Sequence, residues 1–156
     1  MSSPAAHKLN AILAAYETAL LTIKTTGGYH TTVAKADEGA WVHDEPNNLP
    51  GCEVYCADVT YDHALGSSQV TARARIWVTG FLLVTASVDV GPRLRSFGQD
   101  IIKAIMATPR LGLAYVIDTT YTEMAHDQAL DGRDRRAERG VEVHFETRYT
   151  HDVDEP

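Results

Sequence analysis

The fold is decided by the stretch Ser68–Asp89, which reads SQVTARARIWVTGFLLVTASVD. Every even position from Val70 to Val88 is apolar or small, while the odd positions are mostly polar. This period of two predicts a β-strand with one buried face. A turn at Thr79-Gly80 would instead make a hairpin, but the alternation keeps its phase through Gly80, where a glycine can host a bulge. We therefore predict one bent strand of roughly 60 Å, beyond the usual length of about 3–10 residues.

Two helices and four shorter strands are predicted around the long strand. An amphipathic helix over residues 4–25 begins at Ser3-Pro4, a capping serine followed by proline at the first helical position. It ends at Gly27-Gly28, and a second helix follows Val90-Gly91-Pro92 and continues through Thr108, ending before Pro109. The strands span residues 29–35, 51–61, 113–122 and 141–149. They are separated by a loop over 37–50, a turn over 63–68 and a polar insertion over 123–140, and an acidic tail follows.

Alternation within the shorter strands predicts which side chains are buried. In 51–61 the apolar set changes face after Cys56, which predicts a bulge or burial on both faces. One face of 113–122 carries Tyr115, Ile117, Thr119 and Tyr121, and one face of 141–149 carries Val141, Val143, Phe145, Thr147 and Tyr149. The predicted fold class is α+β, a mixed or antiparallel sheet with one unusually long strand and two helices packed on one face. Residues 1–156 are predicted to form a single domain.

The composition limits the function classes. The 156 residues are 44% hydrophobic and carry a net charge of −7, with a pI near 5.4. An acidic chain disfavours a DNA-binding function, which needs a basic surface. The sequence shows no signal peptide and no apolar run of the about 20 residues that a membrane span requires. Cys52 and Cys56 would lie about 13 Å apart along a strand, too far for a disulfide, so we expect free thiols in a reducing cytosol.

No arrangement of residues typical of an active site is found. The seven histidines form no HExxH or His-x-His motif. The nearest approximations to a metal site are His43-Asp44-Glu45 and Asp58 with Asp62-His63, which fall in or beside loops where solvated polar residues are expected. Cys52 lies in mid-strand without a group to activate its thiol. We predict no catalytic, cofactor-binding or metal site, and Asp118 is expected to pair with Arg73, Arg75 or Arg148.

Two features indicate assembly into something larger. The first is the mixed-charge block from Arg133 to Arg139 in the polar insertion, which is either a solvated hairpin tip or a loop that pairs with a neighbouring subunit or lines a ring. The second is the odd-numbered face of the long strand, where Arg73 and Arg75 are followed by apolar residues that a helix or a partner must cover. The predicted interface residues are Arg73, Arg75, Trp77, Phe81, Arg133, Asp134, Arg135 and Arg136.

Several short segments resemble one family across most of the chain. The first helix leads into TGGYHTTV at residues 26–33, and a proline-bounded loop with Glu45-Pro46 and Leu49-Pro50 precedes a strand. The long strand leads into a helix containing DIIKAI at 100–105, and the last strand reads VEVHFETRY at 141–149. This layout resembles the tail terminator, or tail completion, proteins of long-tailed bacteriophages and prophages.

The resemblance implies a structural virion protein and no enzyme. A homohexameric ring would form at the head-proximal end of the tail tube, end tube polymerisation and join the tail to the neck. Its partners would be other copies of itself, the tail tube protein and a neck or head-completion protein, with DNA passing through the lumen without specific binding and with no cofactor or membrane involved. The implied location is the virion tail or neck, assembled in the host cytoplasm. The alternatives are a head–tail connector or stopper, a minor tail protein, and a small enzyme with an unrecognised site.

Overall fold

The computed structural model describes residues 4–38, 46–62, 68–83, 90–126 and 138–152. Within these residues, two α-helices and five strands form an α+β fold, as predicted. The helices are α1 (Pro4–Leu20) and α2 (Val90–Met106), with short 3₁₀ helices at Thr25–Gly27 and Pro46–Asn48. The strands are β1 (Lys35–Glu38), β2 (Gly51–Asp62), β3 (Gln69–Leu83), β4 (Val116–His126) and β5 (Glu138–Asp152).

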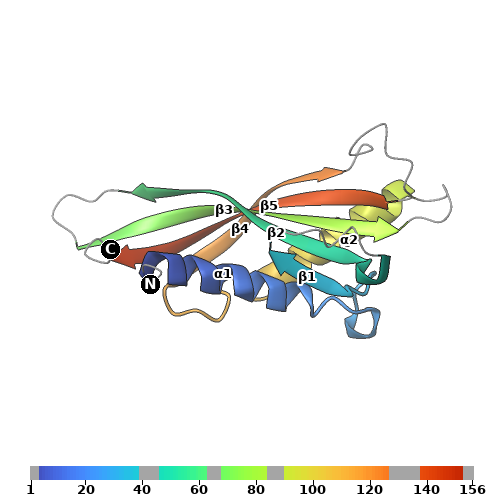
Figure 1. Ribbon diagram of the computed structural model, residues 1–156, viewed down its shortest axis with the longest axis horizontal. Helices are drawn as coiled ribbons and strands as arrows, with labels where there is room; N and C mark the ends of the chain where they lie inside the picture. The colour runs from blue at the N-terminus through green and yellow to red at the C-terminus, as the bar shows by residue number, and fades with distance from the viewer. Residues whose placement is uncertain (1–3, 39–45, 63–67, 84–89, 127–137, 153–156) are drawn as a thin grey trace.

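The sheet is mixed, with the strand order β1-β2-β3-β5-β4. β1 runs parallel to β2, and the other neighbouring pairs are antiparallel. The long strands β2, β3 and β5 cross in a strong twist, and α1 lies along the sheet (Figure 1). Tyr16 of α1 packs edge-on against Phe145, and α2 places Phe97 beside Gly80, so both helices cover the same face.

The central strand β3 is a single strand that continues through Gly80, and the hairpin alternative is wrong. Its even positions from Val70 to Leu82 are buried, which confirms the predicted buried face. The pairing beside Gly80 is regular rather than bulged, since Gly80 lies opposite Cys52 on one side and Val141 on the other. A Cβ atom at Gly80 would come within 2.5 Å of the Phe97 ring. Glycine is therefore required there because α2 approaches the strand closely.

Buried hydroxyl groups tie α1 to the two strands at the far edge of the sheet. The hydroxyl of Tyr16 lies 2.7 Å from Oγ1 of Thr147 on β5, and Thr147 lies 2.9 Å from Oγ1 of Thr119 on β4. All three side chains are almost completely buried, so the chain of hydrogen bonds satisfies polar groups that would otherwise destabilise the core.

The N-terminal half differs from the prediction in two places. The first helix ends at Leu20 rather than 25, because the next residues form tighter turns in which the amides of Thr22 and Ile23 bond the carbonyls three residues before. Residues 29–34 are not a strand, and the edge strand lies later, at Lys35–Glu38. The buried carboxylate of Asp100 accepts the backbone N–H groups of His30 and Thr31, both at 2.9 Å, in place of a ladder partner.

The C-terminal half follows the prediction more closely, with one exception in the side chains that β4 buries. β5 buries Val141, Val143, Phe145, Thr147 and Tyr149, as predicted. The face predicted for residues 113–122 is only partly confirmed: Thr119 is buried, but Ile117 and Tyr121 are exposed, and Val116 is buried instead. The register shift at Val116/Asp118 takes Ile117 out of alternation with Thr119. Tyr121 stays on the same side as Thr119, opposite Phe145, and is exposed because β4 has a neighbouring strand on one side only among the described residues. The bulge predicted after Cys56 in β2 is confirmed.

Several predictions fall on residues outside the described ranges. They are the Ser3 cap, the turn at residues 63–67, the end of the long strand at 84–89, much of the loop before Pro46, the middle of the polar insertion and the end of the tail.

Candidate interaction surface

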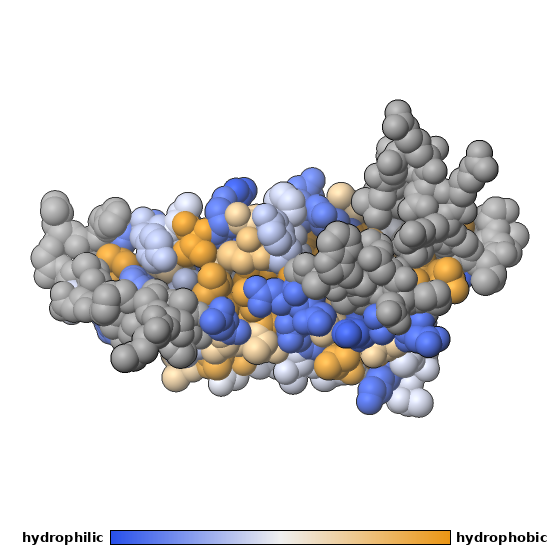
Figure 2. Space-filling model, viewed as in Figure 1, coloured by the Kyte–Doolittle hydropathy of each residue, from blue (hydrophilic) through white to orange (hydrophobic). Residues whose placement is uncertain are grey.

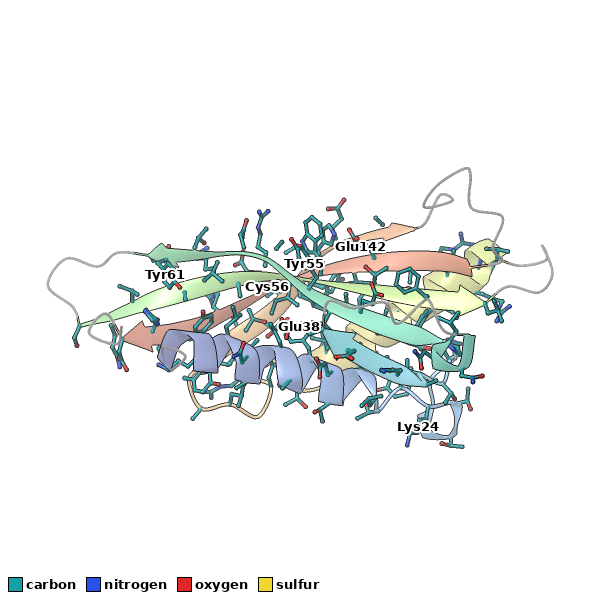
Figure 3. All side chains as sticks on the ribbon, in the orientation of Figure 1. Lys24, Glu38, Tyr55, Cys56, Tyr61 and Glu142 are labelled. Atoms are coloured by element: carbon teal, nitrogen blue, oxygen red, sulfur yellow. The ribbon has the colours of Figure 1, made fainter. Side chains whose placement is uncertain are left out.

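The helices leave the other face of the sheet uncovered by any described element, and we call this face the open face. Strand register places alternate residues of β2, β3, β4 and β5 on it. Its charged and aromatic members with described side chains are Glu53, Tyr55, Asp58, Asp62, Arg73, Arg75, Trp77, Phe81, Asp118, Glu123, Glu142, His144, Glu146, Arg148 and Asp152. Tyr55 and Glu142 point to the side of the sheet away from α1 (Figure 3).

Three ring side chains cross the open face at right angles to the strands. Trp77 stacks on His144 with ring centroids 4.3 Å apart and an angle of 11° between the planes. On the other side of Trp77, Tyr55 makes an edge-to-face contact at 6.0 Å. The Tyr55 side chain is 54% exposed, although large aromatic side chains gain most when buried.

Carboxylates surround His144. Its Nε2 lies 2.5 Å from Oε1 of Glu142 on the same strand, and its Nδ1 lies 3.4 Å from Oε2 of Glu123 on β4. A hollow of about 230 Å³ opens beside the imidazole, and its walls include Trp77, Glu123 and Glu146. We call Tyr55, Trp77, Glu123, Glu142 and His144 the acidic aromatic patch.

The arginines of the open face are all engaged within the chain. Arg148 donates from Nε and Nη2 to the two carboxylate oxygens of Asp118, at 2.8 and 2.6 Å. This is the ion pair predicted for Asp118, with Arg148 as the partner. The hydrogen bonds from Arg148 hold the pKa of Asp118 below its usual range.

The other two arginines pair across β2 and β3. Arg75 donates from Nε and Nη2 to the two carboxylate oxygens of Asp58 in a bidentate contact, and these hydrogen bonds lower the pKa of the Asp58 carboxyl group. Arg73 donates from Nε to Asp62 at 3.1 Å. Asp152 at the end of β5 pairs with Lys8 of α1 at 3.8 Å. Since the other seven described carboxylates face three arginines, the open face keeps an excess of four negative charges.

The residues weighed for catalysis do not converge on a reactive centre. Cys52 is completely buried, and burial raises the pKa of its thiol far above the usual range, so the reactive thiolate is suppressed. Both cysteines are free, as predicted. Asp58 is held by Arg75, and His43, Asp44, Glu45 and His63 lie outside the described ranges. Among the described residues, no group of three or more His, Cys, Asp or Glu side chains is arranged so that it could hold a metal ion.

The predicted interface residues are distributed unequally. Arg73, Arg75 and Trp77 lie together on the open face. Phe81 also lies on the open face by register but is only 6% exposed, so it adds little to the surface. Arg133, Asp134, Arg135 and Arg136 lie outside the described ranges.

Sequence reasoning missed the residues that complete the acidic aromatic patch. Glu142 and His144 alternate with the apolar residues of their strand and so fall on its polar face, but nothing in the sequence shows that β5 lies beside β3. Tyr55 could have been predicted from the alternation along its strand, because an odd-numbered residue there points away from the face of Cys52 and Val54, which are buried. From the viewpoint of Figure 2, exposed hydrophobic residues are interspersed with hydrophilic ones.

The described helices include none that combines the length and the apolar character needed to cross a membrane.

No protein-family model matches the chain, and no curated protein matches it in sequence. Solved structures do resemble it. One is a chain from the "Virion of native gene transfer agent (GTA) particle", with a TM-score of 0.56 over 92% of this chain and 97% of that chain, at 12% sequence identity. At this identity the similarity shows that the two chains share a fold.

Proposed function

We propose that the protein is a structural component of a phage-like virion and that it forms a homohexameric ring at the head-proximal end of the tail tube. The ring ends tube polymerisation and joins the tail to the neck. The observation that carries the proposal is the shared fold with a chain of a gene transfer agent virion, which extends over almost the full length of both chains.

The described surface supports an assembly role over catalysis. The side chains of the open face pair with one another across the twisted sheet, and the hollow beside His144 has a volume of only about 230 Å³. Exposed aromatic side chains such as Tyr55 are typical of surfaces that become buried between proteins. A ring subunit needs two different contact surfaces, because a heterologous interface closes into a ring when the rotation between subunits allows it.

The net charge of −7 fits a channel through which DNA passes. An acidic wall repels phosphates, so DNA would move through the lumen without specific binding. The remaining partners in this proposal are the tail tube protein on one side of the ring and a neck or head-completion protein on the other.

Deletion of the gene tests the terminator role. Without the ring, tail tubes should vary widely in length when negatively stained particles are measured, and expression of the protein in trans should restore a uniform length. Tails of normal length that fail to join heads would instead favour a head–tail connector, and position in the neck, seen with a labelled subunit, separates the two. Normal, infectious particles without the protein would refute both structural roles.

A further inference from the structure

We infer that in the ring the acidic aromatic patch of one subunit binds the cationic exposed face of helix α2 of the next copy. This inference rests on the proposed ring and names the surfaces that join its subunits. It follows from the chemistry of the patch, from the chemistry of α2 and from the positions of both on opposite sides of the sheet.

The patch has the chemistry of a guanidinium-binding surface. The hollow beside His144 is lined by the carboxylates of Glu123 and Glu146 and by the indole of Trp77. Carboxylates bind arginine through charge-assisted hydrogen bonds, and aromatic rings attract its planar cation. Arg75 also borders the hollow, but Asp58 holds its guanidinium group. An arginine from outside would therefore meet a surface of net negative charge.

Helix α2 presents the complementary charge. Between Val90 and Met106 its cationic residues Arg93, Arg95 and Lys103 are exposed. The carboxylate within these residues is Asp100, which is buried and accepts hydrogen bonds from His30 and Thr31. The exposed face of α2 therefore carries positive charges with no carboxylate among them.

The two surfaces cannot meet within one chain. α2 packs on the helical face of the sheet through Phe97 and Ile101, whereas the acidic aromatic patch lies on the open face. Contact between them joins different surfaces of two copies, which is the heterologous arrangement that builds rings. The open face approaches the size of a standard interface: its four strands have 11 to 15 residues, and at a spacing of about 4.8 Å they present on the order of 700 Å². A standard interface buries about 800 Å² per partner.

Charge reversal on each surface tests the inference. The face variant is Glu123→Lys with Glu142→Lys, and the helix variant is Arg93→Glu with Arg95→Glu. Native mass by light scattering over a dilution series should show that each variant needs at least about tenfold more protein than the wild type to associate, a loss of about 1.4 kcal/mol. An equimolar mixture of the two should form rings again, because each reversed surface then meets an oppositely charged one.

A control variant and two outcomes make the test decisive. Asp37→Lys with Glu38→Lys changes the net charge by as much as the face variant does but lies on β1, away from the patch, and should assemble like the wild type. If the wild type forms rings and the reversed variants, shown to be folded by circular dichroism, form them equally well or are not restored by mixing, the inference is wrong while the ring stands. A wild type that stays monomeric at every concentration would refute the ring and the inference together.

Discussion

Replacement of Gly80 by alanine should destabilise the fold, because the site has no room for a methyl group. A Cβ atom there would lie 2.5 Å from Cε1 of Phe97 and 2.9 Å from Cδ1 of Ile101. Ordinary contacts begin near 3.4 Å, and both neighbours are completely buried, so neither can turn outward into solvent. Either α2 must move away from β3 or the two side chains must leave their preferred rotamers.

The expected loss follows from two opposing effects. Adding a methyl group to a packed core costs about 1–3 kcal/mol. Replacing glycine by alanine also reduces the conformational entropy of the unfolded chain, which increases the free energy of unfolding by about 0.4–1 kcal/mol. The net decrease in the free energy of unfolding lies between about 0 and 2.6 kcal/mol, with a midpoint of about 1.3 kcal/mol. At about 2–4 °C per kcal/mol for a domain of this size, the Tm of Gly80→Ala should fall by about 3–5 °C at this midpoint and by at most about 10 °C.

Thermal and urea unfolding, each followed by circular dichroism, would measure the change. Gly27→Ala is the matched control, because the nearest atom to its new Cβ is 3.8 Å away on Tyr29, and its Tm should change little. In a Phe97→Leu background the alanine should cost less, since the ring that it meets has been removed. If Gly80→Ala unfolds at or above the wild-type Tm, α2 does not press against the centre of β3 and the account of Gly80 fails.

Three further predictions concern the core and the open face. Tyr16→Phe removes the hydroxyl bonded to Thr147 and should lower the free energy of unfolding by about 0.5–1.5 kcal/mol in urea titrations; an unchanged value would mean that this bond adds nothing. Because Arg148 lowers the pKa of Asp118, their ion pair stabilises the fold above about pH 4 and is lost as the pH falls through the lowered pKa. Asp118→Asn should therefore lower the Tm at neutral pH more than at acidic pH, and an equal drop at both would contradict the pair. Cys52 should react with a thiol reagent only after unfolding, because it is completely buried and burial raises the pKa of its thiol, and rapid labelling of the native protein would disprove this.

The strands with one buried face could be read from the sequence because alternation there is regular. β3 and β5 keep one register along their shared length, so the parity of the residue number predicts burial from Val70 to Leu82 and from Val141 to Tyr149. Burial in β4 could not be predicted this way, since the bulge at Val116/Asp118 takes Ile117 out of alternation with Thr119, and Tyr121, although opposite the buried Phe145, is exposed on this edge strand. A bulge changes parity without a distinctive residue to mark it.

The candidate surface was less predictable than the fold, since it depends on which strands are neighbours. Trp77 and His144 are 67 residues apart in the numbering but stack because β5 returns beside β3. The edge strand β1 was missed for a similar reason. It is a parallel addition to β2, and the residues before it are satisfied by the carboxylate of Asp100 from α2 rather than by a strand.

The positions of the bulges favour contacts through the faces of the sheet over contacts through its edges. β4 is an edge strand among the described residues and carries two register shifts, and β2 has one just beyond the short partner β1. Bulges twist an edge away and interrupt the row of amides and carbonyls that a further strand would need. The open face has no such interruption at its centre, where Tyr55, Trp77 and His144 lie on three strands in register. A neighbouring copy of the chain would therefore gain more by covering this face than by extending the sheet.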